Sequence, residues 1–339
     1  MSFALVLSSL ASFVSFAFAA FVFAQWRSRR QAYQLVWTVG LVLYGIGAGA
    51  DALALAIGWN EGLYRTWYLA GAFGVAAYLG LGTVFLLNRT RFGYFVALSL
   101  VAGGLIGLAY AAARTKEGAE LPGWEGPAVL AVSLAAAALV AIVTHRARWA
   151  MAPTVAAILV AASLLVVVLG VTVPVAAPGF AINPETGGPV GDAFPYSLRV
   201  LTPPFNVTGA FALVFGAFYS AYIFMPKRRL LRPPERPFVV GLIGRGLAVP
   251  VNFVASLPQA WAAYRAGSLN PRVPATILIA LGGFIPSWTS GLTRFGFGSA
   301  YYVGELLGVL FIFAGFLVSI EAWGVVRPSA ALTADRANP

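Results

Sequence analysis

Long apolar stretches alternate with short polar or basic connections along most of the chain. Most have the roughly 17 to 25 residues needed to cross a hydrocarbon core about 30 Å thick. The nine stretches cover approximately residues 3–26, 32–59, 63–87, 93–113, 127–144, 152–176, 210–225, 274–292 and 300–323. The pattern predicts an all-α fold, a polytopic transmembrane helix bundle of about nine spans.

Composition supports this fold class. The 339 residues are 60% hydrophobic and 10% charged, whereas soluble domains carry about 25% charged residues. A soluble globular domain is therefore excluded. The first stretch lacks the basic start of a secretory signal and is followed by Arg27, Arg29 and Arg30, so we expect a retained helix.

Basic residues predict the orientation. The net charge of +11 comes from 22 Lys and Arg against 11 Asp and Glu. Lys and Arg concentrate on cytoplasmic flanks, and an arrangement with the N-terminus outside places 17 of the 22 inside. The five outside are Arg65, Arg114, Lys116, Arg199 and Arg294. We expect a multi-pass protein of the bacterial cytoplasmic (inner) membrane with a cytoplasmic C-terminus. Lipids are the expected partners of the basic clusters, and nucleic acid is not.

Residues 238–263 are apolar but interrupted by Arg245, Pro250, Asn252 and Pro258. A tenth crossing here would weaken the charge bias, so we favour a cytoplasmic helical hairpin or an interfacial helix. The basic approach to this segment fits anionic headgroups or a docked protein partner. Its candidate contact residues are Lys227, Arg228, Arg229 and Arg232.

These features divide the chain into four parts. Residues 1–225 form a seven-span bundle with an exterior loop at 178–208, whose length predicts a cap packed on the bundle. Residues 226–273 form the basic cytoplasmic or interfacial segment. Residues 274–323 form the last two spans, and residues 324–339 form a cytoplasmic tail.

Asp51 lies inside the second stretch, where an ionisable group costs roughly 2.5 to 3.5 kcal/mol on insertion scales. Tyr44, Gly47 and Ala48 share its helical face, which is small and polar enough to pack closely. Glu305 occupies a similar position in the ninth stretch. Both acids should face the bundle interior.

Two interpretations of these acids stay open. They line a polar, proton-responsive cavity with Tyr301 and Tyr302, or each pairs with an arginine as a structural lock. Arg65 and Arg294 are the candidate arginines for either arrangement.

The eighth stretch combines Gly282, Gly283 and Pro286 with a polar run that follows them. Such residues break helices at transporter substrate sites, but they also produce simple kinks. Glycines spaced four apart, such as Gly304 and Gly308, predict close packing within the bundle.

Other residue types limit the chemistry. The chain has no cysteine and a single histidine, His145, which lies beside arginines at the end of an apolar stretch. We therefore expect no metal, no cofactor, no catalytic residues and no enzyme activity. Tryptophans near the ends of the stretches are expected to form an interfacial aromatic belt: Trp26, Trp59, Trp67, Trp124, Trp149 and Trp323.

Two resemblances add to this interpretation. Leu257-Pro258-Gln259, followed by Tyr264-Arg265, resembles the proline-glutamine signature of the PQ-loop transporters and implies a kinked transport helix. The chain departs from that family in lacking a second proline-glutamine pair and in having more spans. The run 63–71, the run 79–83 and the run 304–308 resemble uncharacterised bacterial multi-pass integral membrane proteins, which implies a fold without a function.

Two functions remain. The leading hypothesis is small-solute or proton-linked transport through the helix bundle, because acids lie within the spans. The alternative is a non-catalytic membrane subunit or sensor that docks a partner protein on residues 226–273, within a larger membrane complex.

Overall fold

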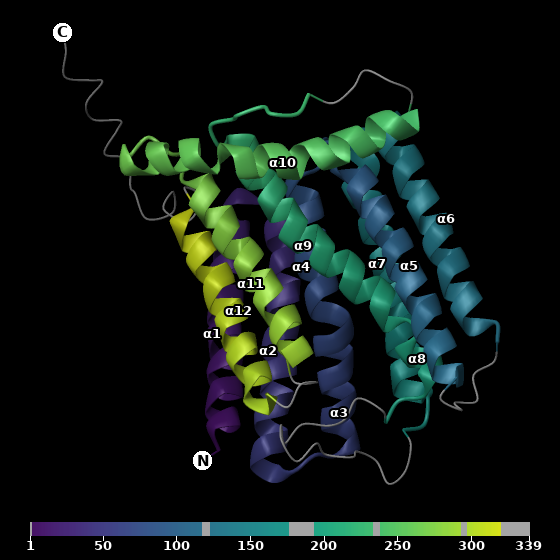
Figure 1. Ribbon diagram of the computed structural model, residues 1–339. Coiled ribbons are helices and arrows are strands. Elements are labelled where there is room, and N and C mark those ends of the chain that lie inside the picture. Colours follow the sequence, from purple (N-terminus) through teal and green to yellow (C-terminus); the bar gives the residue numbers. More distant parts are fainter. Residues whose placement is uncertain (1, 117–122, 176–192, 233–237, 293–296, 320–339) are drawn as a thin grey trace. The chain divides into compact units, whose positions relative to one another are not determined.

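The computed structural model describes residues 2–116, 123–175, 193–232, 238–292 and 297–319 (Figure 1). Within these ranges the chain is helical and contains no strand. Nine helical segments of the described chain are long and apolar enough to cross a membrane. The predicted all-α bundle of about nine spans is confirmed, and the protein is a multi-pass integral membrane protein.

The helices follow the hydropathy pattern closely. The first six spans are α1 (Phe3–Arg29), α2 (Ala32–Ile57), the run of α3 (Glu61–Trp67), η1 (Tyr68–Val75) and α4 (Ala76–Leu86), α5 (Phe92–Lys116), α6 (Glu125–Arg146), and η2 (Arg148–Ala150) with α7 (Met151–Thr172). The remaining helices are α8 (Tyr196–Arg199), α9 (Thr202–Phe224), α10 (Phe238–Arg265), α11 (Arg272–Leu292) and α12 (Gly298–Val318).

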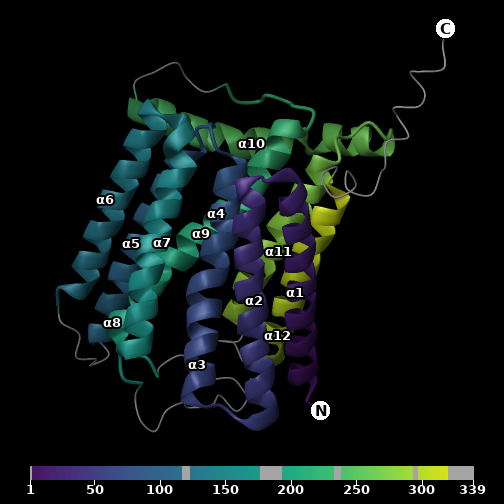
Figure 2. The same ribbon diagram turned by 180° about the vertical axis from the view of Figure 1, so that it is seen from behind.

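The chain divides into two compact units. The first contains Met1–Gly216 and Leu281–Leu310, and the second contains Ala217–Ala280 and Phe311–Pro339. Within the first unit, α1 packs along α2 and α5 packs along α6, and both views show these pairs side by side (Figures 1 and 2). Glycines permit the first contact, because the ring of Phe16 lies against the Cα of Gly45.

The third span changes its hydrogen-bond pattern partway along. Residues Tyr68–Val75 form a π-helix between α3 and α4, which the hydropathy pattern did not predict. Such segments are rare and occur frequently at functional sites. The π-helix begins directly after Trp67, a residue that belongs to the candidate site.

The seventh span begins earlier than predicted. We placed its start near Ala210 and assigned Pro203 and Pro204 to the exterior loop, but α9 starts at Thr202. Proline is well tolerated in the first turn of a helix, where its missing N–H would have no intrahelical partner. The two prolines therefore start the helix.

The second unit contains α10 and the parts of α9, α11 and α12 adjoining it. Ala221 and Met225 of α9 pack with Ala260 of α10 and Val273 of α11, and α10 runs across the adjoining ends of α9 and α11 (Figure 1). The extra helical segment before the last two spans is confirmed. It is one continuous helix with Pro250 and Pro258 inside it, so the helical hairpin was wrong.

Candidate functional site

Asp51 is the centre of the candidate site. It lies on α2 with only 1% of its surface exposed. Its Oδ2 accepts a hydrogen bond from Nε1 of Trp67 at 3.0 Å and another from the hydroxyl of Tyr301 at 3.3 Å. Three helices, α2, α3 and α12, thus meet at one buried carboxyl group.

Glu305 joins the same cluster from one turn further along α12 than Tyr301. Its Oε2 is buried and has no hydrogen-bond partner among the described residues, and its carboxyl group interacts electrostatically with that of Asp51. The hydroxyl of Tyr44 donates to the backbone carbonyl of Glu305 at 2.6 Å. The site therefore holds two acidic groups and two tyrosines, and Tyr302 is buried beside them.

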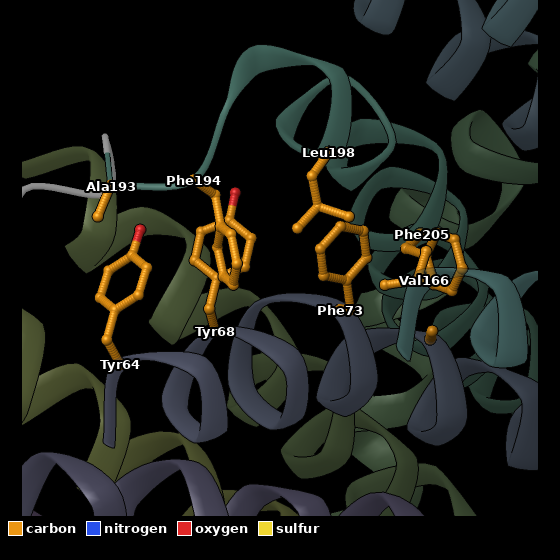
Figure 3. Packing of buried hydrophobic residues seen from close by; sticks show 9 residues of the cluster. Tyr64, Tyr68, Phe73, Val166, Ala193, Phe194, Leu198 and Phe205 are labelled. Atoms are coloured by element: carbon orange, nitrogen blue, oxygen red, sulfur yellow. The ribbon is translucent and has the colours of Figure 1, made fainter. Parts of the chain in front are cut away.

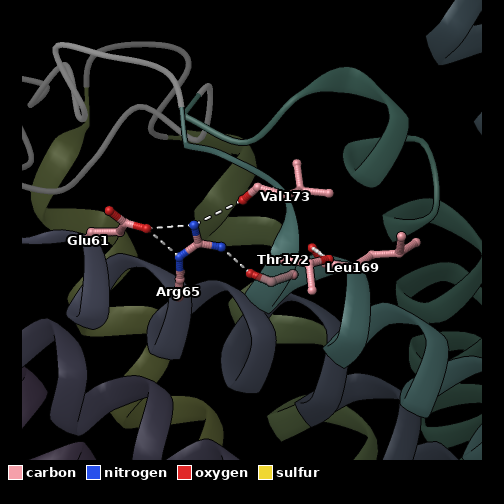
Figure 4. A network of polar contacts seen from close by, with 6 residues as sticks. Glu61, Arg65, Leu169, Thr172 and Val173 are labelled. Carbon is pink, nitrogen blue, oxygen red and sulfur yellow. Dashed lines mark hydrogen bonds and ion pairs between the residues drawn. The ribbon is translucent and has the colours of Figure 1, made fainter.

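Arg65 does not pair with Asp51, so this version of the structural lock is wrong. Its guanidinium binds Glu61 at 2.5 Å and donates to the carbonyl oxygens of Gly170 and Val173 at the end of α7 (Figure 4). The last carbonyls of a helix have no intrahelical donor. Arg65 therefore caps α7 instead of neutralising the site. Arg294 lies outside the described residues.

The eighth span is continuous at the residues that were candidates for a break or a kink. Residues Gly282, Gly283 and Pro286 all lie inside α11, so the broken-helix interpretation was wrong. The ring of Pro286 lies against Gly308, and Thr289 lies against Gly304. Small residues here allow α11 to approach α12 closely, which fixes the helix that carries Tyr301 and Glu305.

An aromatic cluster supports the site from α3 and the π-helix. Phe194 packs between Tyr64 and Tyr68, with ring centroids 5.2 and 5.1 Å away (Figure 3). Phe73 and Phe205 extend the cluster, with centroids 5.2 Å apart. The described part of the predicted exterior loop thus packs against the bundle through Phe194, while residues 176–192 lie outside the described ranges.

A row of polar side chains shares the buried face of α2 with Asp51. Gln34, Thr38 and Tyr44 precede Asp51 on this helix, and all are buried. Gln34 donates to Oε1 of Gln25 on α1 at 3.2 Å. From Gln34 to Asp51 the row extends over about 25 Å at 1.5 Å per residue. The four residues are spaced by four, six and seven positions, a spacing that does not stand out as a single periodic stripe in the sequence.

The predicted contact residues of the second unit lie beside α10. Lys227, Arg228, Arg229 and Arg232 are exposed, while Asn252 accepts from the backbone of Leu230 and Leu231 at 2.8 and 2.9 Å. Ser256 accepts from the backbone of Arg228 at 2.8 Å. One face of α10 therefore holds the basic segment.

Compared with known protein families, curated proteins and solved structures, the chain matches none. The resemblance to PQ-loop transporters stays a prediction, with Pro258 inside α10.

Proposed function

We propose that the protein carries out proton-linked transport, with Asp51 and Glu305 as the groups that take up and release the proton. The observation that carries this proposal is the acidic pair of buried Asp51 and half-buried Glu305, whose Oε2 is itself buried. The pair has no cationic partner among the described residues. Two carboxylates close together in a site of low dielectric repel each other, so a proton bound to the pair relieves the repulsion. The tyrosine and tryptophan donors stabilise the remaining charge.

The row on α2 supports a path for that proton. Gln34, Thr38 and Tyr44 supply polar atoms over a length comparable with a hydrocarbon core of about 30 Å. Intramembrane polar groups are costly, and those that persist commonly mark ion or proton pathways. We infer that the path runs along the buried face of α2, with the acidic pair near one end.

Purified protein in vesicles containing a pH-sensitive dye tests this role. An imposed pH gradient should dissipate faster with the wild-type protein than in empty vesicles, and Asp51→Asn or Glu305→Gln should abolish the difference. Glu61→Gln is the matched control, because it neutralises an acid outside the cluster. Flux through both site variants at the wild-type rate would contradict the proposal.

The proposed orientation has the N-terminus outside and the C-terminus in the cytoplasm of a bacterial cell, in the cytoplasmic membrane. The distribution of Lys and Arg supports it. In this orientation Lys227 and Arg228 face the cytoplasmic leaflet, where anionic headgroups attract basic segments.

A docking role is the second candidate function, and α10 supplies the observation that favours it. Val251, Val254, Leu257, Trp261 and Tyr264 form an exposed stripe at helical spacing on this helix. Exposed apolar stripes bind partner helices or lie on membranes.

A spin label at Val254→Cys distinguishes these two environments of α10. Relaxation by a water-soluble reagent in the purified protein would indicate a free docking surface. Relaxation by oxygen dissolved in lipid would indicate an interfacial helix and remove the support for docking.

A further inference from the structure

A largely apolar cavity lies in the first unit, and neither Asp51 nor Glu305 lines it. Its volume is about 510 Å³, and side chains of α4, α5, α6, α7 and α9 form its walls. Lining positions on α6 extend from Glu125 to Val140, about 22 Å of helix at 1.5 Å per residue. The cavity is therefore long enough for an extended alkyl chain.

The cavity opens toward lipid between α6 and α7. Val132 of α6 and Leu165 of α7 both line it, although 70% and 55% of their surfaces are exposed. Both helices are apolar enough to span the membrane. Hydrocarbon tails of the bilayer would therefore surround this opening, and a chain can enter sideways.

Glu125 places one carboxyl group in this apolar wall. Its surface is 8% exposed, and its Oε2 is buried without a hydrogen-bond partner among the described residues. Ser197 lines the same cavity. A buried acceptor left without a donor is unfavourable, so a ligand that supplies a donor here would be stabilised.

We propose that this cavity binds a single-chain amphiphile with a cationic amine head, whose ammonium group donates to Glu125 and whose alkyl chain lies along α6 and α7. Charge complementarity favours the amine, since a charge-assisted hydrogen bond to a carboxylate is stronger than a neutral one. Most of the described residues that line the cavity are apolar, and an apolar lining favours an alkyl chain over a polar ligand.

Photolabelling of the full-length protein in phosphatidylcholine vesicles tests the site. The probes are hexadecylamine, hexadecanol and palmitic acid, each carrying a diazirine in the chain, and the labelled peptides are identified by mass spectrometry. The amine probe should label peptides of α6 and α7. Glu125→Gln should raise its half-saturating concentration about tenfold, as expected when one charge-assisted hydrogen bond is weakened.

Filling the cavity tests the position of the chain. Ala136→Phe with Ala162→Phe should abolish labelling by the amine probe. The matched control is Ala135→Phe with Ala161→Phe, at exposed positions that do not line the cavity, and it should label like the wild type.

Several results would overturn the proposal. Labelling outside α6 and α7, or labelling unchanged by the filled cavity, would exclude this site. Equal labelling by the three probes would exclude recognition of the amine by Glu125. If a variant fails to fold, competition on the wild-type protein still decides, because unlabelled hexadecylamine should displace the amine probe and palmitate should not.

Discussion

Trp67 and Asp51 occupy matching depths on the two arms of one helical hairpin, and the indole N–H of Trp67 donates to Asp51 across 3.0 Å. Asp51 lies as far before the end of α2 as Trp67 lies after the start of α3. Antiparallel helices joined by a short turn bring such positions side by side. The hydrogen bond therefore follows from the hairpin, and it fixes the orientation of the Asp51 carboxyl group.

Trp67→Phe tests the contribution of this bond. The substitution keeps an aromatic ring but removes the N–H, so we expect a loss of about 1 to 2 kcal/mol in the free energy of unfolding. Denaturant titration in mixed micelles measures it. Trp288→Phe, at an exposed side chain, is the control and should change stability by less than about 0.5 kcal/mol. Equal effects of the two changes would mean that the Asp51 bond contributes nothing.

Arg65→Ala tests the cap on α7. The arginine satisfies two helix-terminal carbonyls, so its removal should cost about 2 kcal/mol. Glu61→Gln should cost less than about 1 kcal/mol, because the Glu61 side chain is 61% exposed and exposed ion pairs contribute little. The same unfolding titration compares them. A larger loss for Glu61→Gln would contradict the assignment of Arg65 to the helix end.

Gly304→Ala tests the contact between α11 and α12. A methyl group at Gly304 would overlap the side chain of Thr289, so we expect a loss of about 1 to 3 kcal/mol from overpacking. Proton flux should fall as well, because Tyr301 and Glu305 lie on the displaced helix. Gly123→Ala is the control, since nothing lies within 4 Å of its new methyl group. If Gly304→Ala had the same free energy of unfolding as the wild type, α11 and α12 would have room for a methyl group at this contact, which would contradict the close packing.

Single cysteines test the topology cleanly in a chain without native cysteine. With nine spans and the N-terminus outside, Gly123→Cys should react with an impermeant thiol reagent added to whole cells. Ser268→Cys should react only after the cells are opened. Reaction of both from the outside would indicate that α10 crosses the membrane, and the reverse pattern would indicate an inverted protein.

The spans, the burial of Asp51 and the partial burial of Glu305 could be predicted from the sequence, because hydrophobic length and the cost of intramembrane charge act locally. The partners of the acids could not. Trp67 was assigned to an interfacial belt by its position near a helix end, whereas the fold directs its N–H to Asp51. Arg65 was a candidate partner of the acids, but it donates to the carbonyl oxygens of Gly170 and Val173 at the end of α7. The local sequence around Arg65 carries no signal for this long-range contact.

Two features of the backbone, the π-helix in the third span and the continuity of α11, could not be predicted from the sequence either. In the π-helix at Tyr68–Val75 each backbone N–H bonds to a carbonyl five residues earlier instead of four. Hydropathy does not distinguish between these two hydrogen-bond patterns. Pro286 was a candidate for either a break or a simple kink, because proline removes one helix hydrogen bond. The packing of its ring against Gly308 accompanies a continuous α11, and only the three-dimensional arrangement shows that contact.

Infrared difference spectroscopy across a pH range tests most directly whether the buried acidic pair holds a proton. The wild-type protein should show the carbonyl stretch of a protonated carboxyl group that shifts on transfer to heavy water and disappears at high pH. Asp51→Asn and Glu305→Gln should each change or remove this signal, while Glu61→Gln should leave it intact. A wild-type spectrum without such a band at any pH, or a band unchanged in both site variants, would contradict proton binding by Asp51 and Glu305.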